Sequence, residues 1–237
     1  SSEVGVSASK GKGYTMRFVV EDGKRTLTAH MDNFRDKEAI DVEITLTQEP
    51  EESMVICTPF EKAGHFYYNQ KINCMRASGC IQFDGKKYTF DPARDFGTLD
   101  WGRGVWTRDN TWYWGSGNTD INGHSFGFNI GYGFGDTTAA SENILFYDGV
   151  AHKLDDVKFH IPASGYTDPW KFTSNNGRFE MDFVPIIDRA AKIDVKVIVT
   201  DQHQVFGRLS GKAVLDDGTV IEVKDMLCFA EDVHNKY

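Results

Sequence analysis

Four of the five tryptophans in this chain of 237 residues lie within fourteen positions, beside an acid and a base. The run Leu99-Asp-Trp-Gly-Arg-Gly-Val-Trp106 is followed closely by Trp112-Tyr-Trp-Gly115. Flat indole rings bury large areas against apolar molecules, and glycines beside them leave room for a ligand. On strands, alternate side chains share a face, so these runs predict a ligand-binding wall. The expected wall contains Trp101, Arg103, Trp106, Trp112 and Trp114.

Two carboxylates in the same part of the chain could supply protons. Asp100 stands among glycines and tryptophans, and Glu142 precedes the apolar run Ile144-Leu-Phe146. Burial raises the pKa of a carboxylic acid and suits it to proton donation, so Asp100 and Glu142 are the candidate catalytic residues. A buried charge without a partner is costly, so we expect both acids to cluster with Arg103 near the pocket. The alternative is a plain aromatic core in which such an ion pair is structural.

Motifs for metals and nucleotides are missing or broken. The seven histidines form no pair at a metal-ligand spacing, and the glycines of Gly131–Gly135 lack the pattern of a phosphate loop. Asn118–Gly123 resembles the start of a calcium loop, but its twelfth position is Asn129 where Glu is needed. We therefore expect no metal and no cofactor.

Charge and composition exclude other classes of protein. Lys and Arg total 26 against 35 Asp and Glu, and the resulting net charge of −9 opposes binding to nucleic acid. No apolar run approaches the ~18 residues of a membrane span. The four cysteines lack CxxC spacing, which favours free thiols in a reducing cytoplasm. A cytoplasmic protein is expected.

Apolar and polar residues alternate with a period of two over residues 40–47, 125–132 and 178–183, which predicts half-buried strands. Six Asx-Gly dipeptides mark hairpin turns, because both residue types tolerate a positive φ. These dipeptides begin at Asp22, Asp84, Asn122, Asp148, Asn176 and Asp217. The chain is therefore predicted to be all-β, an antiparallel meander that closes into a barrel because open edges promote aggregation.

An irregular segment after Asp91-Pro92 separates two groups of predicted strands. We expect a boundary near residue 95, with one β-domain at residues 1–95 and a β-barrel domain at residues 96–237.

Seven motifs spread over most of the chain carry a family resemblance. They are Tyr67-Tyr-Asn-Gln-Lys-Ile-Asn-Cys-Met75, Leu99-Asp-Trp-Gly-Arg-Gly-Val-Trp106, Trp112-Tyr-Trp-Gly-Ser116, Phe128-Asn-Ile-Gly-Tyr-Gly-Phe-Gly-Asp136, Ala140-Ser-Glu-Asn143, Asp201-Gln-His-Gln-Val-Phe-Gly-Arg208 and Phe229-Ala-Glu-Asp-Val-His-Asn-Lys236. Together they closely resemble the family called domain of unknown function 2804, and they add Asn129 and Asn143 to the expected ligand-binding residues. Members usually carry further residues upstream of Ser1. The resemblance thus implies that a missing N-terminal segment, or a homodimer contact, covers the edge strands.

More distantly, Asp100-Trp-Gly102, Trp112-x-Trp114 and Asn122-Gly123 are similar to a succession of motifs in the carotenoid hydratase, kievitone hydratase and AttH-like group. That group has two lipocalin-like barrels in tandem, and some members add water to an alkene of an isoprenoid. The similarity implies two lipocalin-like antiparallel barrels here, the first of them incomplete. Only Asp100, Trp112 and Trp114 carry over residue by residue.

Three functions remain open at this point. The preferred one is binding of a hydrophobic small molecule, a lipid or an isoprenoid, in the aromatic-lined pocket. The second is a cofactor-free hydratase, lyase or isomerase, in which Asp100 or Glu142 protonates a double bond and indole rings stabilise the cation. The third is a scaffold or interaction module without a ligand.

Overall fold

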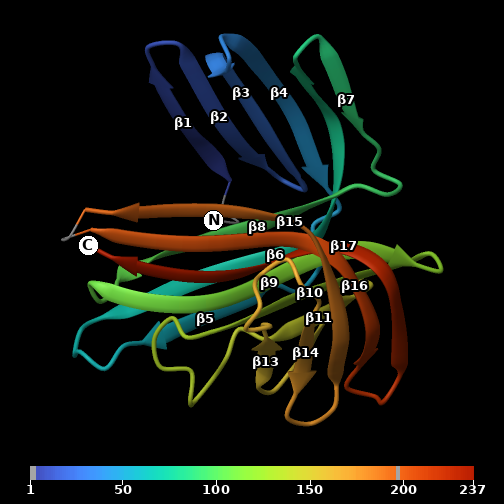
Figure 1. Ribbon diagram of the computed structural model, residues 1–237. Coiled ribbons are helices and arrows are strands. Elements are labelled where there is room, and N and C mark those ends of the chain that lie inside the picture. The colour runs from blue at the N-terminus through green and yellow to red at the C-terminus, as the bar shows by residue number, and fades with distance from the viewer. Residues whose placement is uncertain (1–3, 196–197) are drawn as a thin grey trace.

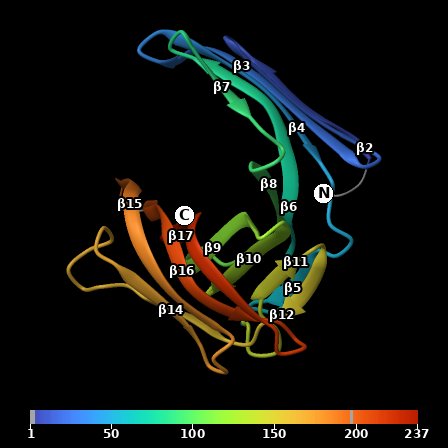
Figure 2. The ribbon, with the colours of Figure 1, turned by 90° about the vertical axis from the view of Figure 1, so that its right-hand side faces the viewer.

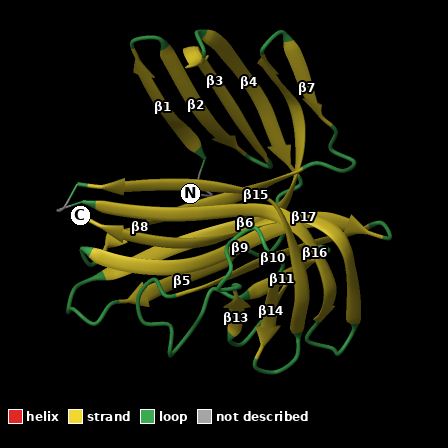
Figure 3. Cartoon of the chain, in the orientation of Figure 1, coloured by secondary structure: helices red, strands yellow, loops and turns green. Residues whose placement is uncertain are grey.

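The computed structural model describes residues 4–195 and 198–237. This part of the chain forms seventeen β-strands joined by turns and loops, with no helix among them (Figure 3). Accordingly, none of the described residues forms a helix that could cross a membrane. The strands build two antiparallel sheets. The prediction of an all-β, antiparallel chain is confirmed.

The N-terminal sheet contains the first eight strands (Figure 1). They are β1 (Gly5–Gly11), β2 (Tyr14–Glu21), β3 (Lys24–Arg35), β4 (Glu38–Thr47), β5 (Met54–Pro59), β6 (Phe66–Phe83), β7 (Lys86–Phe90) and β8 (Phe96–Val105). Their order is β1-β2-β3-β4-β6-β5, and β7 and β8 also pair with β6. The long strand β6 therefore hydrogen-bonds to four others and holds this sheet together.

The C-terminal sheet contains the remaining nine strands in the order β12-β11-β10-β9-β17-β16-β15-β14-β13. They are β9 (Asp109–Ile121), β10 (His124–Tyr132), β11 (Ile144–Tyr147), β12 (Val150–Lys153), β13 (Val157–His160), β14 (Trp170–Ser174), β15 (Phe179–Asp194), β16 (Val199–Val214) and β17 (Val220–Lys236). The expected boundary near residue 95 falls just before β8. Because β8 pairs with β6, the first sheet extends to Val105.

All six Asx-Gly dipeptides lie between consecutive antiparallel strands, as the sequence predicts. At the β9–β10 turn, for example, Asn122 has a φ of 53° and Gly123 a φ of 89°. Asn and Gly adopt this left-handed region at lower cost than other residues. The hairpins thus follow directly from the local sequence.

The C-terminal sheet curls around the larger core of the molecule. Aromatic side chains from opposite parts of this sheet meet there and are almost completely buried, among them Phe126, Phe128, Phe159, Trp170, Phe172, Phe179 and Phe183. The gap between β13 and β10 is bridged by the Phe159 N–H, which donates to the Tyr132 hydroxyl over 3.2 Å. The N-terminal sheet has only a small core, made of Leu46, Ile72, Met75 and Ala77. The fold's apolar stabilisation is therefore concentrated in the C-terminal sheet.

The two sheets come together where β6 and β8 lie beside β9 and β10 (Figure 2). β6 is irregular there: its register with β8 shifts between Ile72 and Met75, and Cys74 has a φ of 63°. The irregularity brings the fully buried Asn73 against the other sheet, where its amide donates to the Ser116 hydroxyl at 2.9 Å and the Phe128 carbonyl at 3.1 Å. These bonds fasten the two sheets to each other.

Replacing Asn73 by Ala is expected to lower the free energy of unfolding by about 1–3 kcal/mol, because buried acceptors lose their donor. The measurement is the midpoint of urea unfolding. Asn175→Ala is the matched control, since Asn175 is exposed and bonds only the exposed Asp155 carboxylate through its side chain. We expect that control to change stability by no more than about 0.5 kcal/mol. Equal losses in the two variants would contradict the fastening role of Asn73.

Candidate functional site

A pocket of about 320 Å³ opens where β6 and β8 face β9 and β17, under the loop between β10 and β11. Both sheets and this loop contribute to its wall. Its lining residues, which define the aromatic pocket, are Tyr67, Lys71, Asp100, Trp106, Trp112, Trp114, Phe134, Glu142 and Glu231. Five aromatic rings, three carboxylates and one ammonium thus surround one small volume.

Strand alternation and register place these side chains. Tyr67 and Lys71 are an even number of residues apart on β6 and therefore share a face. Lys71 is the register partner of Asp100 on β8, and Trp114 on β9 is the partner of Glu231 on β17. Directly opposed residues of neighbouring strands lie on the same face of a sheet. The N-terminal sheet therefore contributes Asp100 to the pocket, and the C-terminal sheet contributes Glu231.

Lys71 is the centre of the pocket's charges and is only 4% exposed. Its ammonium donates a hydrogen bond to the Asp100 carboxylate and lies 4.0 Å from Glu142 Oε2. The same ammonium lies 4.1 Å from the centre of the Trp114 ring. A buried cation needs a carboxylate partner, and an indole face adds further attraction. Lys71 thereby ties β6 to β8 and to β9.

Glu231 is the most deeply buried acid of the pocket, at 6% exposure. Its partners are neutral: the Gln204 amide donates at 2.6 Å and the Trp112 indole N–H at 3.4 Å. Burial raises the pKa of Glu231, and the hydrogen bonds from Gln204 and Trp112 offset this only in part. Glu231 is accordingly the carboxyl group best suited to carry a proton.

Asn129 positions two lining residues without entering the pocket lining itself. It is completely buried and accepts a 2.7 Å bond from the Trp114 indole N–H. Its amide donates to Glu142, at 3.0 Å to the carbonyl and 3.2 Å to Oε2. Gly131 gives the same carboxylate room, because a Cβ there would lie 2.6 Å from Glu142 Oε1. Any larger residue at position 131 would displace Glu142.

Phe134 closes the pocket from the loop between β10 and β11. Its ring packs edge-on against Tyr67 and Trp112, with ring centres 5.0 Å and 5.5 Å apart. Gly133 and Gly135 flank it with φ values of 95° and 86°, and a Cβ on Gly135 would approach the Pro59 carbonyl to 2.8 Å.

Burial, reinforced by the nearby carboxylates, raises the pKa of Tyr67, so its hydroxyl stays protonated.

The structure brings together most of the residues singled out from the sequence. Asp100, Glu142, Trp106, Trp112 and Trp114 line the aromatic pocket.

The structure differs from the expected charge cluster in one member, the cation. Arg103 is three residues from Asp100 on β8 and so points to the opposite face, where it is exposed. Lys71 takes the position expected for Arg103. Asn143 is also placed away from the pocket lining: its side chain accepts from the Gly131 N–H and donates to the Asp155 carbonyl.

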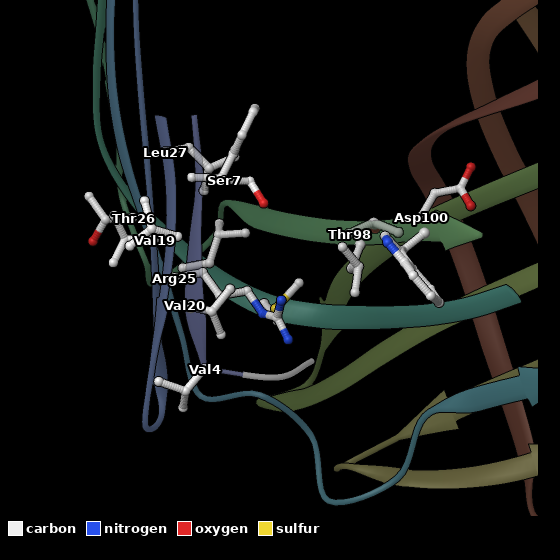
Figure 4. A pocket seen from close by; sticks show the side chains of 16 residues that line it. Val4, Ser7, Val19, Val20, Arg25, Thr26, Leu27, Thr98 and Asp100 are labelled. Atoms are coloured by element: carbon white, nitrogen blue, oxygen red, sulfur yellow. The ribbon is translucent and has the colours of Figure 1, made fainter. Parts of the chain in front are cut away.

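Trp101 lies on the other face of β8 and contacts Tyr68 edge-on, with ring centres 6.0 Å apart. It lines a second hollow of about 500 Å³ between β8 and strands β1–β3, here called the N-terminal trough (Figure 4). In Figure 4 the Asp100 carboxylate points away from this trough. The prediction that Trp101 shares a wall with the other three tryptophans is therefore wrong.

Sequence reasoning missed Lys71, Glu231, Tyr67 and Phe134. All four stand inside motifs that carry the family resemblance, in the runs that begin at Tyr67, Phe128 and Phe229. The charged residues within these motifs, Lys71 and Glu231, were the signal from which sequence reasoning could have found the site. Among the described residues, no group of three or more His, Cys, Asp or Glu side chains could hold a metal ion. The aromatic rings and carboxyl groups that line the pocket are of the kinds suited to apolar binding and to proton transfer.

Two solved structures illustrate how the chain compares with known folds. A candidate AttH protein from Nitrosomonas europaea has a TM-score of 0.52 and 16% identity, over 92% of this chain and 67% of that one. Kievitone hydratase from Nectria haematococca has a TM-score of 0.34 and 12% identity, over 94% of this chain and 83% of that one. The first similarity identifies the fold as lipocalin-like, in agreement with the expectation from sequence.

A search of curated proteins finds no match to the chain. The sequence profile described as domain of unknown function (DUF2804) matches residues 1–237. Because this match covers the whole sequence, the chain belongs to the family of domain of unknown function 2804.

Proposed function

We propose that the aromatic pocket binds a small molecule with a largely apolar body. One observation carries this proposal: five aromatic side chains, from both sheets and from the loop between β10 and β11, line an open volume of about 320 Å³. Interiors are normally close-packed, so a wall of large rings around open volume is typical of a ligand site. Glu142 and Glu231 provide polar anchors, and Trp106, Trp112 and Phe134 provide apolar area.

A second candidate function is proton transfer to the bound molecule, as in a hydratase, lyase or isomerase. The observation in its favour is Glu231, whose neutral partners and burial suit it to hold a proton. In a hydration, Glu231 would give its proton to one alkene carbon while water adds to the other. The Glu231 carboxylate, or Asp100, would then take the proton that the added water loses. The hydration written in this way needs no cofactor.

Binding is tested with N-phenyl-1-naphthylamine, a neutral dye that fluoresces in apolar surroundings. We expect saturable binding, and we expect Trp112→Ala to weaken it about tenfold or more, because about 2 kcal/mol of apolar contact is lost. Trp101→Ala is the matched control, since Trp101 faces the N-terminal trough. A loss of dye binding in Trp101→Ala alone would place the dye in the trough and contradict the proposal. Absence of dye binding would favour the scaffold function.

The buried Glu231 makes stability depend on pH. A carboxyl group with a raised folded-state pKa binds protons more tightly in the folded protein than in the unfolded chain. Its burial therefore costs stability as the pH rises above about 4.5, the ordinary value for Glu. We expect Glu231→Gln to melt a few degrees higher than the wild type at pH 7, with the difference closing towards pH 4.

The measurement is thermal unfolding followed by circular dichroism across this pH range. Glu222→Gln, an exposed change on the same strand, is the control and is expected to show no such pH-dependent gain. A Glu231→Gln variant that is less stable than the wild type at pH 7 would show that Glu231 is stabilised as an anion.

A further inference from the structure

The aromatic pocket carries more negative than positive charge. Among the described residues that line it, Asp100, Glu142 and Glu231 are acids and Lys71 alone is a base. Uncompensated negative charge in a desolvated site is unfavourable, and it attracts a cation. The composition of the wall thus points to the charge of its ligand as well as to its apolar body.

Lys71 does not balance all three acids. Its ammonium bonds Asp100 and occupies one face of Trp114, while Glu142 Oε2 lies at 4.0 Å, beyond hydrogen-bond distance. The next base, Lys153, donates to the backbone carbonyls of Ser141 and Asn143 and acts on Glu142 only through longer-range attraction.

Glu231 has an even weaker connection to positive charge. Its hydrogen bonds come from the neutral groups of Gln204 and Trp112. Glu142 and Glu231 are therefore the two acids that remain available to a ligand.

A buried acceptor beside the pocket adds to this negative potential. Asn69 lies between Tyr67 and Lys71 on the same face of β6 and is 2% exposed. Its Oδ1 receives no hydrogen bond from any group in the described part of the chain. A buried carbonyl oxygen without a donor is uncommon and favours a positively polarised neighbour.

We propose that the ligand of the aromatic pocket is an organic cation, an alkylammonium group joined to an apolar body. Aromatic rings attract ammonium groups through their electron-rich faces, and Trp106, Trp112 and Phe134 supply such rings beside Glu142 and Glu231. The Glu142 carboxylate provides counter-charge, Glu231 adds to it when it has released its proton, and the pocket volume limits the ligand to a small molecule. This inference rests on the proposed binding function and specifies its ligand class.

The test compares phenyltrimethylammonium with tert-butylbenzene. The two compounds have the same shape, but the atom that carries the three methyl groups is a positively charged nitrogen in the first and a neutral carbon in the second. Direct binding of each compound to the full chain is measured by equilibrium dialysis. We expect the cation to bind about tenfold more tightly than the neutral compound. Glu231→Gln and Glu142→Gln should each reduce binding of the cation about threefold to tenfold, and should leave binding of tert-butylbenzene unchanged or stronger. Glu222→Gln, exposed on the strand that carries Glu231, should alter neither.

Equal or tighter binding of tert-butylbenzene would overturn the cation preference, while the pocket would stand as an apolar binding site. Failure of both compounds to bind would also overturn the inference. Only a failure of N-phenyl-1-naphthylamine as well would remove the proposed binding function. Cation binding that survives both Glu→Gln changes would place the cation elsewhere and would contradict the assignment to this pocket.

Discussion

Burial of the Lys71 ammonium is the constraint on which the rest of the site depends. A cation at 4% exposure is tolerated only beside carboxylates, and it meets Asp100 from β8 and Glu142 from the loop between β10 and β11. Asp100 fixes the register of β8 against β6, and Glu142 fixes the end of the loop that covers the pocket. The rings of Trp114 and Phe134 then lie around this charged centre. Removal of the ammonium would leave the acids of both sheets facing each other.

The sequence predicts those features that depend on nearest neighbours. Alternation over residues 125–132 predicts strand β10, and Asn122-Gly123 predicts the turn before it. The common face of Trp112 and Trp114 follows from the same rule, and both residues line one pocket. Local periodicity and turn chemistry were sufficient for the all-β class, because each uses interactions within a few residues.

Partners that are distant in the chain could not be predicted in the same way. Lys71 and Asp100 are 29 residues apart, and only the register of β6 with β8 makes them neighbours. Arg103 was the nearer base in sequence, but the odd spacing of three sends it to the other face of β8. The pairing of β8 with β6 in the preceding sheet likewise joins segments that local patterns do not connect. Cross-strand register is a property of the whole fold.

The irregularity of β6 at Cys74 has a consequence for how this family can vary. Lys71 and Asn73 face the C-terminal sheet. Ile72 and Met75 lie in the core of the N-terminal sheet, so β6 contributes side chains to the packing of both sheets. Adding or deleting a single residue between Tyr67 and Ala77 would exchange the two sets of side chains. Length changes within β6 would therefore disrupt both sets of contacts, whereas the exposed hairpin tip at Asp84 can absorb them. Changes of length are therefore expected in the exposed loops of this fold, and the register of β6 is expected to stay fixed.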